Sequence, residues 1–195
     1  MSGSNELRLV TKPQQYLVHK YKKEPNNPKD FGQKIKCSQI HGSCPLCSSG
    51  DSPKPRWFIG AITRKDQSYK ILDVGYAVYQ SIRKLATNPR WGDPSKYDID
   101  IFVDKKGGAT GYYTVQPIAK EPLSAENQRT VDNIDMEQLA KMVTPLTPDQ
   151  VKARIDKIGG PLSQVAKGGD KLATQSPTVN MASEDADDDV FPDAN

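Results

Sequence analysis

Alternation of apolar and polar residues marks several stretches of the chain as β-strands. Within residues 97–104 every second residue is apolar, so Ile99, Ile101 and Val103 are expected to face a core. Four further stretches have the β-branched and aromatic content of strands and are separated by turn sequences: residues 16–21, 56–64, 69–74 and 112–117. The pattern therefore predicts a β-rich region of five strands.

Apolar residues at helical spacing predict three helices. The first, residues 76–87, carries Val78, Ile82 and Leu85 on one face and stops at Asn88-Pro89. Two later helices are predicted over residues 135–143 and 148–158, and the last of these has Thr147 as its cap and a proline in its first turn.

Five strands with a helix inserted after the third match a small Greek-key barrel of the OB type. We therefore predict a mainly β protein with helices, of the α+β class, and a β-sandwich is the alternative architecture. Residues 105–111 form a glycine-rich turn before the last strand. A phosphate loop is not expected there, because no Gly-Lys-Ser/Thr ending and no following helix accompany the glycines.

Composition divides the chain into a basic body and an acidic end. Hydrophobic residues make up 35% of the 195 residues, which is low for a chain folded throughout. Residues 183–195 hold six acidic residues and no basic one, so the net charge of +3 leaves +9 for residues 1–182. We expect a disordered acidic tail and a polyanion as partner of the body, with an ordinary lysine-rich surface as the alternative.

Targeting signals are not evident in the sequence. No apolar run approaches the length that spans a membrane, and the N-terminus lacks the basic-then-apolar pattern of a secretory signal. The sequence therefore predicts an intracellular, soluble protein with no membrane partner.

The three cysteines Cys37, Cys44 and Cys47 lie close together in the sequence. A Cys-x2-Cys pair with Pro-Leu between the thiols is typical of a tetrahedral zinc site, and the fourth ligand would be either His41 or His19. Three free thiols of an intracellular protein are the alternative interpretation. A closed set of four ligands predicts a structural zinc ion that contributes folding energy, rather than a catalytic one.

Aromatic and basic residues are interleaved along the predicted strands and the turns between them. Single-stranded nucleic acid needs this mixture, because bases stack on rings while Lys and Arg neutralise phosphates. Some of these rings must instead fill the core. The candidate DNA-binding residues are Arg56, Trp57, Arg64, Lys65, Tyr69, Lys70, Arg83, Lys84, Arg90, Trp91, Lys105, Lys106 and Tyr112.

No catalytic constellation is evident in the sequence, so we predict that the protein is not an enzyme. Asp98, Asp100 and Asp104 are carboxylates spaced along one predicted strand, which makes a metal-dependent nuclease one alternative. A solvated strand face explains them more simply. A zinc-knuckle adaptor that binds other proteins is the second alternative function.

Several motifs together resemble one protein family. They are Cys37 with Cys44-Pro45-Leu46-Cys47, Arg56-Trp57-Phe58-Ile59-Gly60, Tyr69-Lys70-Ile71-Leu72-Asp73-Val74-Gly75, Trp91-Gly92-Asp93-Pro94 and Tyr97-Asp98-Ile99-Asp100-Ile101. Over about residues 16–123 the chain resembles the replicative single-stranded DNA-binding proteins of T-even-like tailed phages. The resemblance implies an OB-fold that coats single-stranded DNA in phage replication, recombination and repair, within the cytoplasm of the infected host cell.

The resemblance also implies site residues and partners. Family members bind zinc through an upstream histidine and three cysteines, which favours His19 over His41. They self-associate on DNA through a basic, hydroxyl-rich arm, whereas residues 1–12 here have only Arg8 and Lys12 as basic residues. Their acidic tails engage replication and recombination proteins. The acidic end of this chain also resembles, in composition, the tails of bacterial single-stranded DNA-binding proteins, in which acidic residues surround a hydrophobic anchor. The candidate partner-binding residues are Asp187, Asp188, Asp189 and Phe191.

The predicted organisation follows from these observations. In chain order we expect a flexible arm at residues 1–15, an OB-fold core at 16–123 with a zinc subdomain at about 30–50, a helical segment at 124–158, and a linker with the disordered tail at 159–195.

Overall fold

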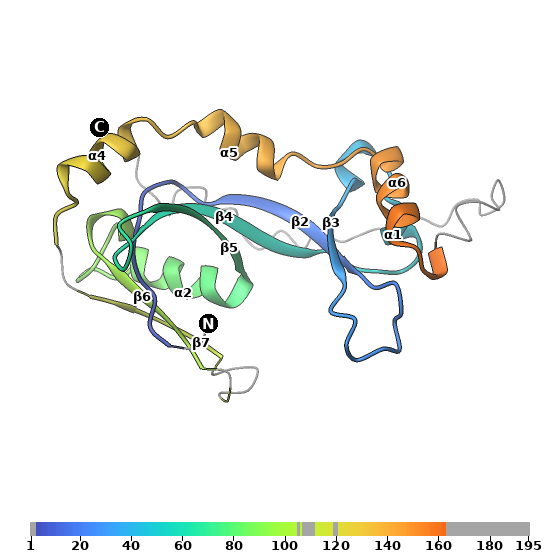
Figure 1. Ribbon diagram of the computed structural model, residues 1–195, viewed down its shortest axis with the longest axis horizontal. Coiled ribbons are helices and arrows are strands. Elements are labelled where there is room, and N and C mark those ends of the chain that lie inside the picture. Colours follow the sequence, from blue (N-terminus) through green and yellow to red (C-terminus); the bar gives the residue numbers. More distant parts are fainter. Residues whose placement is uncertain (1–2, 105, 107–111, 119–120, 163–195) are drawn as a thin grey trace. The chain divides into compact units, whose positions relative to one another are not determined.

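The computed structural model describes residues 3–104, 106, 112–118 and 121–162 (Figure 1). The predicted disordered tail, with Asp187, Asp188, Asp189 and Phe191, lies outside the described residues, as does Lys105. The described chain is mixed α+β and divides into two compact units. We call residues 3–15 and 56–143 the sheet unit, and residues 16–55 and 144–162 the cysteine unit.

Five antiparallel strands build the sheet unit, in the spatial order β5-β4-β1-β6-β7. Their bounds are Glu6–Leu9 for β1, Lys54–Thr63 for β4, Tyr69–Gly75 for β5, Ile99–Val103 for β6 and Tyr113–Pro117 for β7. Helix α2 (Tyr76–Ala86) and the 3-10 turn η2 (Pro94–Lys96) connect β5 to β6. The predicted strands from residue 56 onward and the helix after residue 75 are thus confirmed.

The core of the sheet unit forms between the sheet and α2. Ile99 and Ile101 of β6 are buried as their alternation predicts, and Val78 and Ile82 of α2 pack against them. Tyr97 is fully buried just before β6. The hydrophobic spacing of α2 was therefore a correct guide to the face that it buries.

The prediction of a flexible arm at residues 1–15 is wrong. Leu7 and Leu9 are buried, and β1 lies in the middle of the sheet, with Leu7 opposite Thr63 of β4 and also paired with β6. Beyond the strand, the Gly60 N–H donates a 2.6 Å hydrogen bond to Thr11 Oγ1. The strand has only four residues, so its sequence shows too little alternation to be distinguished from a polar arm.

The cysteine unit combines a hairpin with short helices. Its elements are β2 (Gln14–Tyr21), β3 (Gln33–Lys36), the 3-10 turn η1 (Gln39–His41), α1 (Pro45–Ser48) and α6 (Pro148–Ile158). Val151 and Ile155 of α6 are buried against Ile35 and Leu46 in a second hydrophobic cluster. This unit is larger than the predicted subdomain at about 30–50, since it recruits a helix from far along the chain.

The predicted helical segment at residues 124–158 is present as three helices. Helices α4 (Ala125–Asp132) and α5 (Met136–Val143) belong to the sheet unit, whereas α6 belongs to the cysteine unit. Helix α6 begins with the predicted cap: Thr147 and Gln150 form a reciprocal capping box. Among the described residues, no helix is both long and apolar enough to cross a membrane.

Candidate metal centre and nucleic-acid interface

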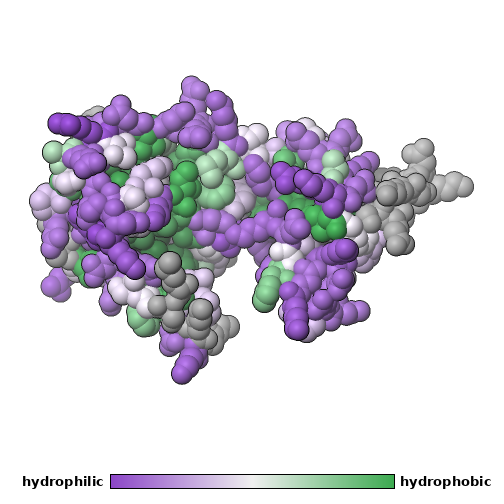
Figure 2. Space-filling model, in the orientation of Figure 1, coloured by the Kyte–Doolittle hydropathy of each residue, from purple (hydrophilic) through white to green (hydrophobic). Residues whose placement is uncertain are grey.

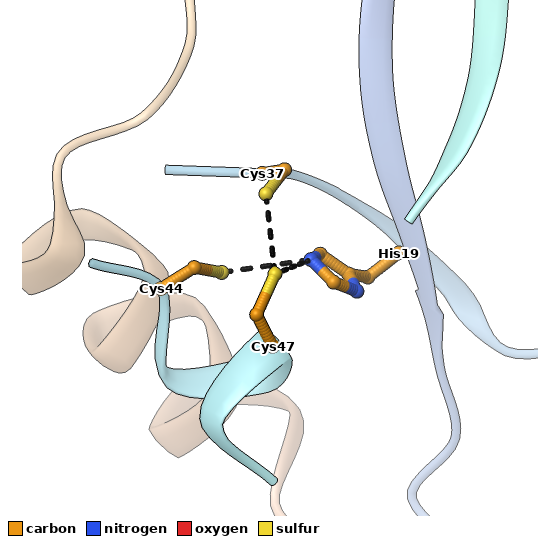
Figure 3. Close-up of side chains that lie close together, drawn as sticks. All are labelled: His19, Cys37, Cys44 and Cys47. Atoms are coloured by element: carbon orange, nitrogen blue, oxygen red, sulfur yellow. Dashed lines mark hydrogen bonds between the residues drawn. The ribbon is translucent and has the colours of Figure 1, made fainter. Parts of the chain in front are cut away.

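Four potential metal ligands converge in the cysteine unit. His19, Cys37, Cys44 and Cys47 place one ligand atom each within 4.8 Å of all the others, and Figure 3 shows the four side chains pointing toward a common centre. The cysteines are not joined by disulfides. His19 is fully buried, and Cys37 and Cys44 are nearly so. This cluster could hold a metal ion.

Local structure explains how the ligands meet. His19 lies opposite Ile35 in the β2–β3 ladder, and the Cys37 N–H bonds the carbonyl of Leu17, so both ligands face the same side of the hairpin. Cys44 is the residue before α1, and Cys47 lies in that helix, so one short turn presents both thiols.

Only one of the two candidate histidines joins the cluster. His41 ends the exposed turn η1, which has no buried residue. Gly42 follows in a left-handed conformation with φ of 90°, and the chain then reverses toward Cys44. The Ser38 hydroxyl ties this loop by a 2.8 Å hydrogen bond to the Ser43 carbonyl.

A carboxylate lies behind the imidazole. Asp51 Oδ2 is 2.8 Å from His19 Nδ1, so Nδ1 carries a proton and donates it in a hydrogen bond to the carboxylate. This bond orients the ring so that Nε2 faces the centre of the cluster. Nε2 lies 3.5 Å from the sulfurs of Cys44 and Cys47. Burial alone would lower the pKa of His19, but hydrogen bonds with Cys44 and Asp51 outweigh burial and raise it.

The three thiols differ in pKa. Burial would raise the pKa of Cys44, but hydrogen bonds from His19 and the Ser38 backbone lower it to about 5. Burial raises the pKa of Cys37 and of Cys47, and for Cys47 the neighbouring Cys37 and Cys44 add to the rise. Without a cation the cluster therefore holds one thiolate near neutral pH, while two thiols keep their protons.

Metal affinity is expected to rise by about two decades per pH unit around neutrality, because at least two thiol protons must leave when an ion binds. Acid therefore favours release of the ion. Competition with a chelating dye at a series of pH values measures the slope. An affinity that stays constant with pH would mean that the ion binds without Cys37 and Cys47.

The sheet unit contains a cleft of about 960 Å³ between its strands and the first turn of α2. Apolar residues of β5 and α2, among them Leu72, Val74 and Val78, line it, and Figure 2 shows apolar surface over this region of the unit. Four cationic residues line the same cleft: Arg56, Arg64, Lys65 and Lys70. We call this the sheet cleft.

The cleft cations differ in how firmly they are held. Arg64 is fixed by Asp98, and Arg56 is paired with Asp73 at 2.6 Å. Lys70 pairs with Asp66 on the surface, where both side chains are about half exposed. Lys65 has no ion-pair partner in the part of the chain that the structure describes. Lys65 and Lys70 are therefore the cations most easily turned toward an incoming anion.

The other predicted DNA-binding residues lie outside the cleft lining. Trp57 is buried and stacked on Tyr79, with ring centroids 3.9 Å apart, so a base could reach it only if Tyr79 moved. Trp91 packs on the core beside Tyr97, under the guanidinium of Arg90. Tyr69 packs against Gly60, and Arg83 and Lys84 lie in the last turn of α2. The remaining candidates are the exposed Lys106 and the half-buried Tyr112.

Two exposed tyrosines were missed by the sequence interpretation. Tyr113, not Tyr112, lines the cleft, and it lies opposite Val103 in the β6–β7 ladder. Tyr76, at the start of α2, is 60% exposed between the cleft residues Gly75 and Ala77. The register of the hairpin decides which of the adjacent tyrosines faces the cleft, and that register depends on a turn that the sequence does not define.

The carboxylates considered for a nuclease have structural partners. Asp98 binds Arg8 and Arg64, and Asp100 accepts hydrogen bonds from the Ser4 hydroxyl and the Asn5 N–H. These carboxylates thus tie β1 to β6.

No protein-family model, curated protein or solved structure matches this chain.

Proposed function

We propose that the protein coats single-stranded DNA by base stacking and phosphate neutralisation, without catalysis. The observation that carries this proposal is the sheet cleft, which combines cations with the half-exposed ring of Tyr113 over an apolar floor. Exposed rings and mobile lysines together suit an unpaired strand, because every base has a face to stack and every nucleotide a phosphate.

The strand order supports an OB-type barrel. Numbered within the sheet unit, the strands follow the order 3-2-1-4-5, with α2 between the third and the fourth. OB folds are five-stranded, partly open Greek-key barrels that bind oligonucleotides on one face. In this proposal the barrel's first strand is β1, in place of the predicted strand at residues 16–21.

Each side of the cleft has a role in binding. Lys65 and Lys70 neutralise phosphates, and Lys70 exchanges its exposed partner Asp66 for the strand. The ring of Tyr113 stacks on a base, and Tyr76 offers a second ring at the start of α2. Arg56 and Arg64 stay with their carboxylates, so they fix the wall of the cleft without adding free positive charge.

Zinc is the metal that we propose for the cysteine unit. Zinc bonds of about 2.3 Å to sulfur and 2.0 Å to nitrogen set tetrahedral edges of about 3.8 Å between sulfurs and 3.5 Å between sulfur and nitrogen. The sulfurs of Cys37 and Cys47 are 3.6 Å apart, and His19 Nε2 is 3.5 Å from two sulfurs. Zinc held here would offset most of the thiolate charge and stabilise the unit.

The biological setting that we propose comes from the phage family that the motifs resemble. It comprises DNA replication, recombination and repair in the cytoplasm of an infected host. Replication and recombination proteins would dock on the acidic residues Asp187, Asp188 and Asp189 around Phe191, and further copies of the chain would lie along the DNA.

Replacing Tyr113 with alanine is expected to weaken binding of a thymidine oligomer about 5- to 150-fold, the loss of one stacked base. Fluorescence anisotropy with a labelled oligomer measures this. Phe102→Ala is the matched control, since Phe102 is exposed on the adjacent strand, is not a cleft residue, and pairs with Thr114 rather than with Tyr113. Equal losses in both variants, or none in Tyr113→Ala, would argue against the cleft as the DNA site.

A further inference from the structure

Positive charge is concentrated in the cysteine unit. Residues 16–55 and 144–162 hold ten Lys and Arg against five Asp and Glu, a net charge of +5, whereas the longer stretches 1–15 and 56–143 together carry +3. Three thiolates and one Zn²⁺ would leave a charge of −1 at the metal site, which the excess of basic residues in this unit exceeds. The charge therefore indicates a polyanion contact on this unit.

The lysines gather on one side of the β2–β3 hairpin. Lys20 lies directly opposite Lys34 in the ladder, and Lys36 lies opposite Val18 on the same face. Like charges directly across an antiparallel pair destabilise it. The opposite face of the hairpin carries His19 and Ile35 toward the metal cluster and its core.

An exposed aromatic residue lies in the loop that joins the two strands carrying these lysines. Phe31 is 77% exposed in the loop between the two strands, which extends away from α1 and α6 in Figure 1. Gly32 follows with φ of +70°, and a Cβ there would lie 3.1 Å from Lys22 Cγ and 3.2 Å from Lys20 Cγ. The stems of Lys20 and Lys22 thus pass close to the residue that follows the ring.

The acidic residues of the loop hold its shape. Asp30 accepts 2.8 Å hydrogen bonds from the backbone N–H groups of Glu24 and Gly32, and the Glu24 carboxylate accepts a 2.7 Å hydrogen bond from the Asn27 amide. The loop that presents Phe31 is therefore built by its own carboxylates. Because hydrogen bonds hold the loop in shape, the Phe31 ring stays exposed and available to bind a partner.

We propose that Lys20, Lys22, Phe31 and Lys34, here called the hairpin patch, form a second binding site for single-stranded nucleic acid. One base stacks on Phe31, and the lysines bind the flanking phosphates. The inference rests on the proposed function and adds a contact outside the sheet cleft. It also gives the metal a part in binding, because His19 and Cys37 fix the two strands that carry the patch.

Phe31→Ala in the zinc-loaded full chain is expected to weaken binding of a thymidine oligomer of about 30 nucleotides by about 5- to 150-fold, and Phe31→Trp is expected to retain it. Ile40→Ala is the matched control, because Ile40 is 78% exposed in the same unit and lies outside the patch. In a second variant, Lys20→Gln with Lys34→Gln should reduce the log–log salt slope by about 1.4.

The possible results distinguish a failure of the hairpin patch from a failure of the proposed DNA-binding function. If Phe31→Ala binds like the wild type while Tyr113→Ala is weakened, the hairpin patch is not a DNA site and the sheet cleft stands alone. If the wild type binds no strand, both proposals fall. Tighter binding by Phe31→Ala would show that the patch holds an acidic peptide, such as the chain's own residues 183–195, and would also overturn the inference.

Discussion

Replacing Cys44 with serine is expected to release the metal ion and unfold the cysteine unit. Structural zinc contributes about 10–16 kcal/mol in small zinc domains, as much as the whole stability of a typical domain. The hydrophobic cluster of this unit is small, and Cys37 and Cys44 are themselves part of it. Metal content by plasma mass spectrometry should fall well below one ion per chain. Hydrogen exchange should accelerate in β3 and α6.

The strands β4 and β5 should keep their protection in that variant, since they belong to the sheet unit. His41→Ala is the matched control, because it removes the exposed histidine and should leave one ion per chain. A chelator added to the wild type should reproduce the loss of protection, and added zinc should reverse it. Full metal content in Cys44→Ser, with α6 still protected, would contradict this account of the cluster.

Replacing Asp98 with asparagine is expected to destabilise the sheet unit by about 3–5 kcal/mol, the usual cost of removing one partner from a buried ion pair. Asp98 is 2% exposed and accepts charge-assisted hydrogen bonds of 2.8 to 3.0 Å from the guanidinium groups of Arg8 and Arg64. The change leaves two guanidiniums without their carboxylate. They would retain the amide oxygen of the asparagine and backbone carbonyls such as that of Glu121, none of which carries a compensating charge.

Urea unfolding followed by tryptophan fluorescence measures this effect. Both tryptophans of the chain, Trp57 and Trp91, lie in the sheet unit, so the signal reports on that unit. Asp66→Asn is the control, because it breaks the exposed pair with Lys70 and should leave the unfolding midpoint nearly unchanged. Equal midpoints for Asp98→Asn and the wild type would show that the buried pairs do not stabilise the unit.

The local sequence pattern was sufficient to predict those strands and helices that have a clear hydrophobic periodicity or a capping residue. Alternation identified the strand around Ile99 and Ile101, and helical spacing identified the face of α2 that holds Ile82. Thr147 and Pro148 marked the start of α6 because the cap and the first-turn proline are local signals. The spacing of the three cysteines likewise predicted, without any tertiary information, a cluster that could hold a metal ion.

Features decided by long-range pairing were not available from the sequence. The strand around Leu7 and Leu9 is defined by its neighbours β4 and β6, and four residues show no period of their own. His19 joins the cluster because the β2–β3 register turns it to the side of Cys37, whereas the spacing of residues in the sequence left His41 as an alternative. The burial of Trp57 under Tyr79 depends on the packing of α2.

Binding of a thymidine oligomer by the zinc-loaded protein, measured by anisotropy over a series of salt concentrations beside a matched duplex, tests the central proposal most directly. The two phosphates neutralised by Lys65 and Lys70 predict a log–log slope of about −1.4 from the cleft alone, with clear preference for the single strand. Absence of binding at low salt, or binding that salt does not weaken, would contradict the proposal and favour a protein-binding adaptor built on the cysteine unit.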